Sequence, residues 1–393
     1  MKKKVLFMVI NMNIGGTEKA LLNLIDAMPE DRYDITILML EEYGGFLEFI
    51  PKRVKVIQLS GYESIKSLMN NPPKQILIRT LINKRINELF QLSWCYFISA
   101  MKKDRSSLFK YLMEKISFHS DDYDAAIAYA GPMDFISYFI LRKVSAKKKF
   151  QWIHFDVTKI GFNQNFAFNN YPEFDSIYTV SSEAKNKLVS IIPSLTNKVK
   201  VFHNLVPTKK VLDEARIGEG FTDEFYGIRI LTVGRLSKEK GQDLAIRVMA
   251  NLKKSGLNVR WYLIGEGSSR REYEKLINNY NLTQDVILLG SKSNPYPFMR
   301  QCDIYVQPSR HEGYCITLAE ALLFKTNVIA TNFVGAMEQI QSKQRGIVIN
   351  FEESELYNAL KQLILHDHSE KKLSTINVGE NREEIQKVIE VFI

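Results

Sequence analysis

The chain has 393 residues, of which 45% are hydrophobic and 25% charged, and this length suggests two or three domains. The composition excludes collagen-like, disordered and low-complexity proteins. Three widely spaced cysteines, Cys95, Cys302 and Cys315, exclude a disulfide framework or a zinc ribbon and favour a reducing, cytoplasmic compartment. No uncharged run reaches the roughly 20 apolar residues of a membrane span. The N-terminal apolar run stops at Asn11 without a cleavage site, which predicts a buried strand rather than a signal peptide.

The first half of the chain alternates apolar, β-rich runs with amphipathic helical patterns, which indicates a parallel, doubly wound sheet. We therefore predict an N-terminal Rossmann-like domain over residues 1–206. Residues 60–122 show helical patterns without a clear strand and are interpreted as an insertion. The predicted strands are 5–10, 35–40, 54–59, 125–130, 150–155, 177–180 and 199–202, with helices at 17–28 and 135–144.

The second half begins with a charged, glycine-containing segment without a period, residues 207–227, which is interpreted as a linker. A second alternation predicts a C-terminal Rossmann-like domain over 228–370, followed in 371–393 by a helix that packs back on the N-terminal domain. Two such domains imply a deep cleft between them, with ligands at the carboxyl ends of the strands. The predicted strands are 228–233, 260–264, 286–289, 304–306, 328–329 and 346–349, and the helices are 242–254, 270–279, 313–324, 355–365 (capped by Ser354) and 382–392.

The net charge of +9 is concentrated in one segment. Between residues 62 and 118 there are ten basic and four acidic residues, and the basic residues are interleaved with aromatic ones. This pattern suits an anionic membrane surface, and a nucleic acid is not expected as a partner. The alternative is a pair of amphipathic helices whose aromatic residues are core and whose lysines are solvated. The aromatic residues are Phe90, Trp94, Tyr96, Phe97, Phe109 and Tyr111.

The first chemical motif is HEGYCITLAEAL at residues 311–322, between a predicted strand and a predicted helix. If the helix begins at Gly313, its free N–H groups and dipole suit a diphosphate. Glu312, just before that end, could accept hydrogen bonds from sugar hydroxyls. Glu320, about two turns further on, could hold a ribose. Alternatively, Glu312 caps the helix and Glu320 is a solvated surface residue.

The second motif is GRLSKEKG at residues 234–241, directly after the predicted strand 228–233. A departing nucleotide diphosphate accumulates negative charge on its terminal phosphate. Cations fixed at the end of a strand, here Arg235 and Lys240, could stabilise that charge without a metal. The alternative is that both residues form surface salt bridges, and Lys238 is expected to be solvated.

These two motifs resemble segments of the retaining glycosyltransferases of family 4, which have the GT-B architecture of two facing Rossmann-like domains. Glu312 and Glu320 resemble that family's pair of glutamates with seven residues between them. Residues 234–241 are similar to its G-R-x-x-x-x-K-G segment, whose Arg and Lys contact the donor diphosphate. Weaker similarities involve four further segments. Gly15-Gly16 resembles the family's acceptor-side loop, and Trp152-Ile153-His154 resembles its W-x-H segment near the transferred sugar. Gly265-Glu266-Gly267 resembles the turn beneath the nucleotide, and the segment from Gly335 through Glu338 resembles the late G-x-x-E segment.

The resemblance assigns roles to residues throughout the motifs. It implies that Glu312, Arg235, Lys240 and His154 are catalytic and that Gly15 and Gly16 are on the acceptor side. No metal or cofactor is implied. Asp122 and Asp124 formally match a metal-binding D-x-D, but they precede a strand and are interpreted as its charged start. The implied donor-binding residues are Glu320, Gly313, Tyr314, Cys315, Gly234, Gly265, Glu266, Gly335 and Glu338.

The function implied by the resemblance is metal-independent, retaining transfer of a sugar from a nucleotide-diphosphate donor to an acceptor hydroxyl. UDP is the expected nucleotide because it is the most frequent in the family. The basic, aromatic insertion favours a lipid-linked glycan as acceptor, as in capsule or other surface-polysaccharide assembly, and a peripheral location on the inner face of the plasma membrane. The alternatives are a nucleotide-sugar epimerase of the same architecture and a non-catalytic, nucleotide-sugar-binding partner of another transferase.

Overall fold

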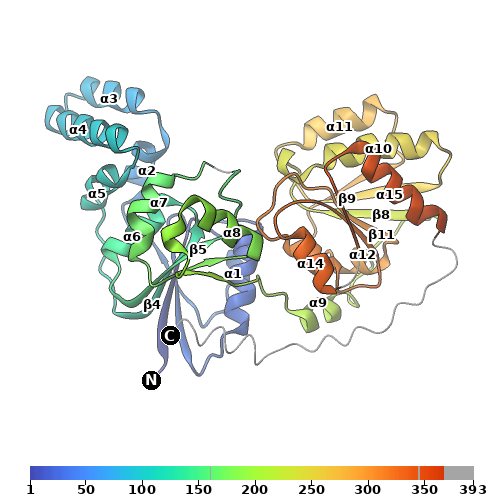
Figure 1. Ribbon diagram of the computed structural model, residues 1–393, viewed down its shortest axis with the longest axis horizontal. Coiled ribbons are helices and arrows are strands. Elements are labelled where there is room, and N and C mark those ends of the chain that lie inside the picture. The colour runs from blue at the N-terminus through green and yellow to red at the C-terminus, as the bar shows by residue number, and fades with distance from the viewer. Residues whose placement is uncertain (160, 344–345, 367–393) are drawn as a thin grey trace. The chain divides into compact units, whose positions relative to one another are not determined.

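The computed structural model describes residues 1–159, 161–343 and 346–366, and the chain divides into two compact units (Figure 1). The first unit contains Met1–His203, and the second begins at Asn204. Each contains one parallel sheet with helices packed against it. The prediction of two Rossmann-like domains is therefore confirmed. The helix predicted within 371–393 lies outside the described residues.

The first unit has a seven-stranded sheet in the order β3-β2-β1-β4-β5-β6-β7. Its strands are β1 (Lys3–Val9), β2 (Tyr33–Met39), β3 (Lys55–Gln58), β4 (Tyr123–Gly131), β5 (Ala146–Ile153), β6 (Ser176–Thr179) and β7 (Val199–Val201). Its longer helices are α1 (Gly16–Ala27), α2 (Tyr62–Asn70), α3 (Pro73–Ile82), α4 (Ile86–Lys102), α5 (Ser106–Glu114), α6 (Asp134–Lys143), α7 (Gln164–Asn170) and α8 (Ser182–Ile191).

Alternation along β1 places side chains on both faces of this sheet. Leu6 and Met8 join a buried cluster with residues of α5 and α6, such as Leu112 and Phe139. Phe7 points to the opposite face, where its ring contacts Tyr129 with centroids 5.7 Å apart. Because both faces are buried, β1 reads as a continuous apolar run rather than an alternating one.

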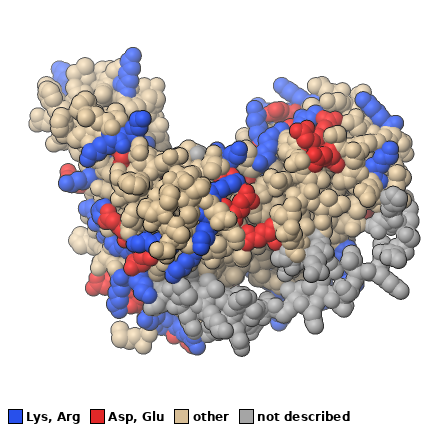
Figure 2. All heavy atoms as spheres, in the orientation of Figure 1, with Lys and Arg blue, Asp and Glu red and all other residues tan. Residues whose placement is uncertain are grey.

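The predicted insertion consists of α2 to α5 before β4 begins. Helices α3 and α4 lie side by side and extend away from the sheet of the first unit (Figure 1). The lobe that they form carries Lys and Arg side chains along its margin (Figure 2). In the described part of the chain, no helix is both long enough and apolar enough to cross a membrane.

The second unit has a six-stranded sheet in the order β10-β9-β8-β11-β12-β13. Its strands are β8 (Ile228–Val233), β9 (Val259–Ile264), β10 (Val286–Gly290), β11 (Ile304–Gln307), β12 (Asn327–Thr331) and β13 (Ile347–Ile349). Its longer helices are α9 (Thr208–Glu214), α10 (Gln242–Lys254), α11 (Arg270–Asn279), α12 (Tyr296–Gln301), α13 (Ile316–Ala321), α14 (Ala336–Lys343) and α15 (Glu353–His366).

Two separate cores cover the two faces of the second sheet. Ile230 and Trp261 pack with residues of α10, α11 and α15. The intervening residues Leu231 and Tyr262 point to the other face and pack with α9, α12 and α13. Alternate side chains along each strand thus pack against two helical layers, one on each face of the sheet. This is the doubly wound arrangement predicted from the sequence.

Apart from shifts of one or two residues at the ends of elements, four sequence predictions differ from the structure. The predicted helix 313–324 is reduced to α13, because Cys315 is extended and the last turn tightens into bonds such as Leu323 N–H to the Glu320 carbonyl. Residues 207–227 are not only a linker, since they contain α9 with Val211 fully buried. β5 begins at Ala146, where pairing with β4 overrides three consecutive lysines. Ser354 lies inside the first turn of α15 and does not cap it.

Candidate active site

The carboxyl ends of β8 and β11 lie side by side, although β9 and β10 separate them in the sequence. The register pairs Ile230 with Ile304 and Leu231 with Tyr305. Strands β9 and β10 are added on one side of β8, and β11 to β13 on the other. At such a switch point the loops diverge, and ligands bind outside the carboxyl ends of the strands. The two chemical motifs follow β8 and β11 and therefore share this edge.

Lys240 and Glu312 form an ion pair across this edge. Lys240 Nζ lies 2.6 Å from Glu312 Oε1, and the hydroxyl of Ser309 donates to the same oxygen at 2.7 Å. Burial opposes the charged form of Lys240, but the Glu312 carboxylate more than offsets this effect, so the pKa of Lys240 is raised. Only 9% of the Glu312 side chain is exposed. The pair therefore presents a fixed ammonium group beside a nearly buried carboxylate.

Ser309 is in turn held by residues of β11, which the sequence analysis did not identify. Gln307 Nε2 donates to Ser309 Oγ at 2.9 Å, and Tyr305 donates to Gln307 Oε1 at 2.8 Å. All three side chains are buried. The only sequence signal for Ser309 is its position: it is a polar residue two positions after a buried strand and three positions before Glu312.

Arg235 is the second residue after β8, and its backbone is fixed while its side chain is exposed to solvent. The buried amide of Gln242 donates to the Arg235 carbonyl at 2.8 Å. Next to it, Leu236 N–H donates to the Glu266 carbonyl at 3.0 Å. Lys238 is exposed as predicted. The turn therefore holds the backbone of Arg235 and leaves its side chain exposed at the sheet edge.

Gly265 allows the turn after β9 to approach the turn after β8. Its φ of +144° is a conformation that glycine adopts readily, and an added Cβ would lie 2.0 Å from the Gly234 carbonyl oxygen. At Gly267 an added Cβ would lie 2.3 Å from the Leu236 carbonyl oxygen. Glu266, between them, pairs with Arg270 on α11. Both glycines are thus required by backbone contact, whatever ligand lies above them.

The loop before α13 contains Gly313, Tyr314 and Cys315. Cys315 precedes the helix with φ −81° and ψ 99°, so Gly313 does not open it as predicted. Burial, reinforced by Glu312, raises the pKa of the Cys315 thiol to about 12. This thiol is therefore neutral and unsuited to act as a nucleophile.

Glu320 is buried inside α13, with 3% of its surface exposed. The hydroxyl of Tyr296, at the start of α12, donates to Glu320 Oε1 at 2.8 Å. Burial, and secondly Glu320, raise the pKa of Tyr296. Glu320 is the fifth residue of α13, whereas Glu312 lies in the loop before this helix. No feature of the sequence indicated the Tyr296 partner.

Gly335 and Glu338 lie at the start of α14. Gly335 has φ +81° and accepts Gln339 N–H at 3.1 Å. Burial, and secondly Glu338, raise the pKa of Tyr314. Electrostatic interaction therefore links the β11 loop with the first turn of α14.

In the first unit, the predicted residues lie after β1 and β5. Gly15 precedes α1 with an extended backbone, and an added Cβ at Gly16 would meet nothing within 4 Å. His154 is buried, and neither ring nitrogen has a hydrogen-bond partner among the described residues. Burial lowers the pKa of His154 to about 3 against a weaker opposing effect of the Tyr129 backbone. The imidazole is therefore neutral at physiological pH.

Asp122 and Asp124 lie at the amino end of β4, as the sequence predicted. Ser145 donates to Asp122 at 2.7 Å, and Lys147 pairs with Asp124 at 2.7 Å. Across the ranges that the structure describes, no three His, Cys, Asp or Glu side chains are grouped to hold a metal ion.

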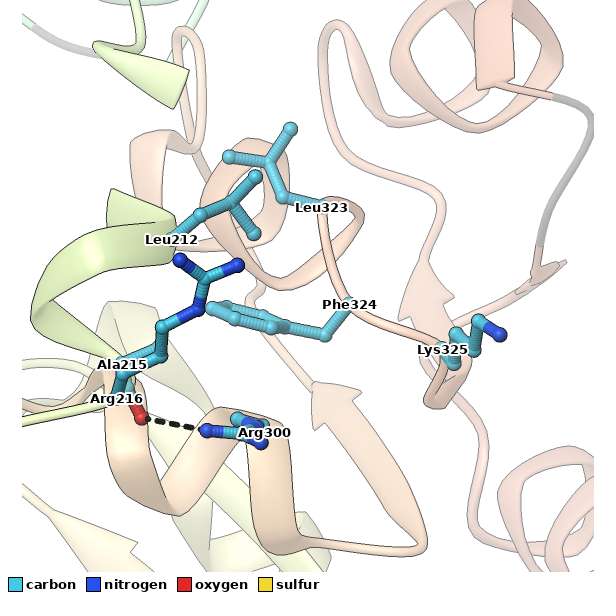
Figure 3. A pocket seen from close by; sticks show the side chains of 7 residues that line it. All are labelled: Leu212, Ala215, Arg216, Arg300, Leu323, Phe324 and Lys325. Carbon is cyan, nitrogen blue, oxygen red and sulfur yellow. Dashed lines mark hydrogen bonds between the residues drawn. The ribbon is translucent and has the colours of Figure 1, made fainter. Parts of the chain in front are cut away.

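A cavity of about 360 Å³ lies elsewhere in the second unit (Figure 3). Arg216 extends across it past Leu212 and Phe324, and Arg300 donates to the Ala215 carbonyl at 3.5 Å. Arg300 and Phe324 come just before β11 and β12. The cavity is therefore at the amino ends of the strands, opposite the edge that holds Lys240 and Glu312.

The motifs and their surroundings lie in one region of similarity to known proteins. Residues 227–382 match the family model of the Glycosyl transferases group 1. The group 1 match contains Arg235, Lys240, Glu312 and Glu320 and starts at the residue before β8.

Curated relatives share this similarity over part of their length. An N-acetylgalactosaminyltransferase of Campylobacter jejuni, whose substrate is N-acetylgalactosamine-N,N'-diacetylbacillosaminyl-diphospho-undecaprenol, is 30% identical over 203 residues, 51% of this chain and 54% of that protein. The capsular polysaccharide glycosyltransferase CapM of Staphylococcus aureus is 26% identical over 44% of this chain and 47% of that protein. The chain spans about half the length of the first curated relatives that it matches.

Solved structures extend the likeness to both units. Anabaena Alr3699/HepE in complex with UDP and glucose superposes with a TM-score of 0.62 at 17% identity, covering 93% of this chain and 90% of that one. Staphylococcus aureus TarM, in complex with UDP and other ligands, gives 0.62 at 14% identity, covering 93% of each chain. At these identities the likeness concerns the fold, and it confirms the predicted GT-B class.

Proposed function

We propose that this chain is a retaining glycosyltransferase that moves a sugar from a nucleotide-diphosphate donor to an acceptor hydroxyl. The observation that supports this most strongly is the Lys240–Glu312 ion pair of 2.6 Å beside Arg235, at the switch point of the second sheet. A cation pair suits a diphosphate, and a carboxylate suits sugar hydroxyls. Lys240 and Glu312 hold each other in place there before any ligand arrives.

Lys240 and Arg235 are proposed to stabilise the leaving diphosphate. An ammonium group has three N–H donors, and Glu312 accepts one of them within the described part of the chain. The remaining two can be directed at phosphate oxygens. Because Ser309 holds Glu312 and Glu312 holds Lys240, little reorganisation is needed as negative charge grows in the transition state.

The proposed reaction takes place on one face of the sugar. The acceptor oxygen forms a bond to the anomeric carbon as the bond from that carbon to the phosphate oxygen breaks. The acceptor proton passes to the leaving phosphate, so no enzymic nucleophile is required and the configuration is retained. Glu312 would hold the sugar and Glu320 the ribose.

UDP is the proposed nucleotide, and a lipid-linked glycan is the proposed acceptor. Complexes with UDP among the structural neighbours support the first choice. The Campylobacter jejuni relative, whose substrate is linked to diphospho-undecaprenol, supports the second. Such an acceptor would place the protein on the inner face of the plasma membrane. Surface-polysaccharide assembly would then be its role, in keeping with the capsular relative.

A transfer assay tests the function. Product is expected from a UDP-sugar and a polyprenyl-diphosphate glycan, with retained anomeric configuration by NMR, and turnover is expected to persist in excess EDTA because Arg235 and Lys240 supply the positive charge. Loss of turnover in EDTA with recovery on adding Mn²⁺ or Mg²⁺ would contradict metal independence. Formation of an epimer from the donor alone would show that the protein is a nucleotide-sugar epimerase and not a transferase.

The role of Glu320 is testable by donor binding. If Glu320 holds a ribose that does not change during the reaction, Glu320→Ala should raise the donor KM about tenfold or more and leave kcat at saturating donor nearly unchanged. Tyr296→Phe is the matched control, since it removes the 2.8 Å hydrogen bond without removing the carboxylate. A loss of melting temperature in both variants with an unchanged donor KM would show that Glu320 is only structural.

A further inference from the structure

Helix α4 exposes a continuous row of large apolar side chains. They are spaced by three or four positions and therefore lie on one face of the helix. Trp94 and Phe97 stack on each other with ring centroids 5.9 Å apart and an interplanar angle of 28°. The row, here called the apolar stripe, consists of Ile86, Phe90, Trp94, Phe97 and Met101, whose exposed fractions are 59%, 71%, 64%, 55% and 71%.

The apolar stripe is not the face that packs on the protein. The opposite side of α4 carries Leu92, which is fully buried, and Tyr96, whose hydroxyl donates to the Leu68 carbonyl at 3.2 Å. Arg105, just after α4, donates to the Met69 carbonyl at 2.9 Å. These contacts fix the orientation of α4 on the first unit. The aromatic residues of the insertion thus divide into packed ones and exposed ones.

Helix α3, which lies beside α4, also exposes apolar side chains. Ile78, Leu81 and Ile82 are 48%, 59% and 72% exposed, whereas Ile76 and Thr80 are buried. The two helices together, residues 72–103, are here called the α3–α4 hairpin. A row of exposed apolar side chains such as the apolar stripe marks a site of interaction with a protein or a membrane.

Charge distinguishes between these two kinds of partner. The α3–α4 hairpin contains six basic residues and one acidic residue, Glu88, which is paired with Arg85 and Lys115. A second copy of the chain would bring two such basic surfaces together, which electrostatic repulsion disfavours. An anionic lipid surface would instead attract them. The basic residues, all exposed, are Lys74, Arg79, Lys84, Arg85, Lys102 and Lys103.

We propose that the α3–α4 hairpin docks this protein on an anionic lipid bilayer, with the apolar stripe lying in the plane of the interface. Trp94 and the two phenylalanines would sit at the boundary between headgroups and acyl chains, where aromatic residues are favoured. The basic side chains would contact lipid phosphates. Seventeen residues of α4 span about 26 Å, so this helix lies on the membrane and does not cross it. The proposal does not depend on the proposed glycosyl transfer.

Tryptophan fluorescence offers a direct test on the full chain. The protein has three tryptophans. Trp94 is exposed, whereas Trp152 and Trp261 are buried, with exposed fractions of 1% and 0%. Vesicles of phosphatidylglycerol and phosphatidylcholine with brominated acyl chains should quench Trp94, and phosphatidylcholine vesicles alone should quench it much less. Raising the salt concentration should weaken binding, by about fivefold for each lipid contact of a basic residue that is screened.

Variants identify the surface. The double variant Phe90→Ser/Phe97→Ser, which retains Trp94, should bind anionic vesicles at least tenfold more weakly. Phe168→Ser on α7, whose side chain is 63% exposed outside the hairpin, is the matched control and should bind normally. Unquenched Trp94, equal binding to neutral vesicles, or unchanged binding of the double variant would overturn the proposal. So would a dimer, seen by sedimentation equilibrium, that the double variant abolishes.

Discussion

Replacing Lys240 by alanine is expected to lower kcat about 100-fold or more at saturating nucleotide sugar, with a smaller effect on the donor KM. The proposed charge on the diphosphate develops chiefly in the transition state, so losing a fixed cation costs turnover more than binding. The neighbouring Lys238→Ala is the matched control, because that side chain is exposed and should leave kcat within about twofold. Steady-state kinetics of both variants gives the comparison.

The ion pair predicts that the effects on kcat of substituting Lys240 and Glu312 are not additive. Glu312→Ala should also lower kcat about 100-fold, because it removes a sugar contact and releases Lys240, whose Nζ is 2.6 Å away. Residues that act as a unit are non-additive, so the double alanine variant should be little worse than either single variant. If the two losses multiply, Glu312 does not position Lys240. Normal turnover of Glu312→Ala would show that its assigned role is wrong.

Gly265→Ala is expected to destabilise the second unit by about 3 kcal/mol or more. The new Cβ would lie 2.0 Å from the Gly234 carbonyl oxygen, and the φ of +144° is itself costly for alanine. Separating the two turns would displace the backbone of Arg235 as well, so kcat should fall even in the folded protein. Urea denaturation followed by circular dichroism measures the loss of stability.

Gly256→Ala separates the two causes of that loss. Gly256 follows α10 with φ +73°, but an added Cβ there would meet nothing within 4 Å. This variant therefore carries only the backbone cost, about 1 kcal/mol. Equal losses in the two variants would mean that the turn after β9 moves freely, and that contact with Gly234 does not constrain the site.

Local patterns predicted much of the fold because a strand buried on both faces of a parallel sheet has a continuous apolar sequence that is easily recognised. The bounds of β8, α10 and α11 agree with the sequence prediction at both ends. β5 was predicted too short, because three consecutive lysines at its start conceal the strand; Lys147 pairs with Asp124, and Lys149 donates to the Leu141 carbonyl. The shortening of α13 was not predictable either, since an apolar period continues through residues where the chain turns.

The sequence by itself determined the alternation of strands and helices in both units and the kinds of groups at the strand ends, including Arg235, Lys240 and Glu312. Only the tertiary structure decided which of those groups meet. The strand order places β11 beside β8, so Lys240 pairs with a glutamate 72 positions away, and Tyr296 reaches Glu320 inside the fold. It also decided which face of α4 is exposed. Side-chain contacts depend on distance through space, and in a parallel sheet that distance is fixed by strand order rather than by separation along the chain.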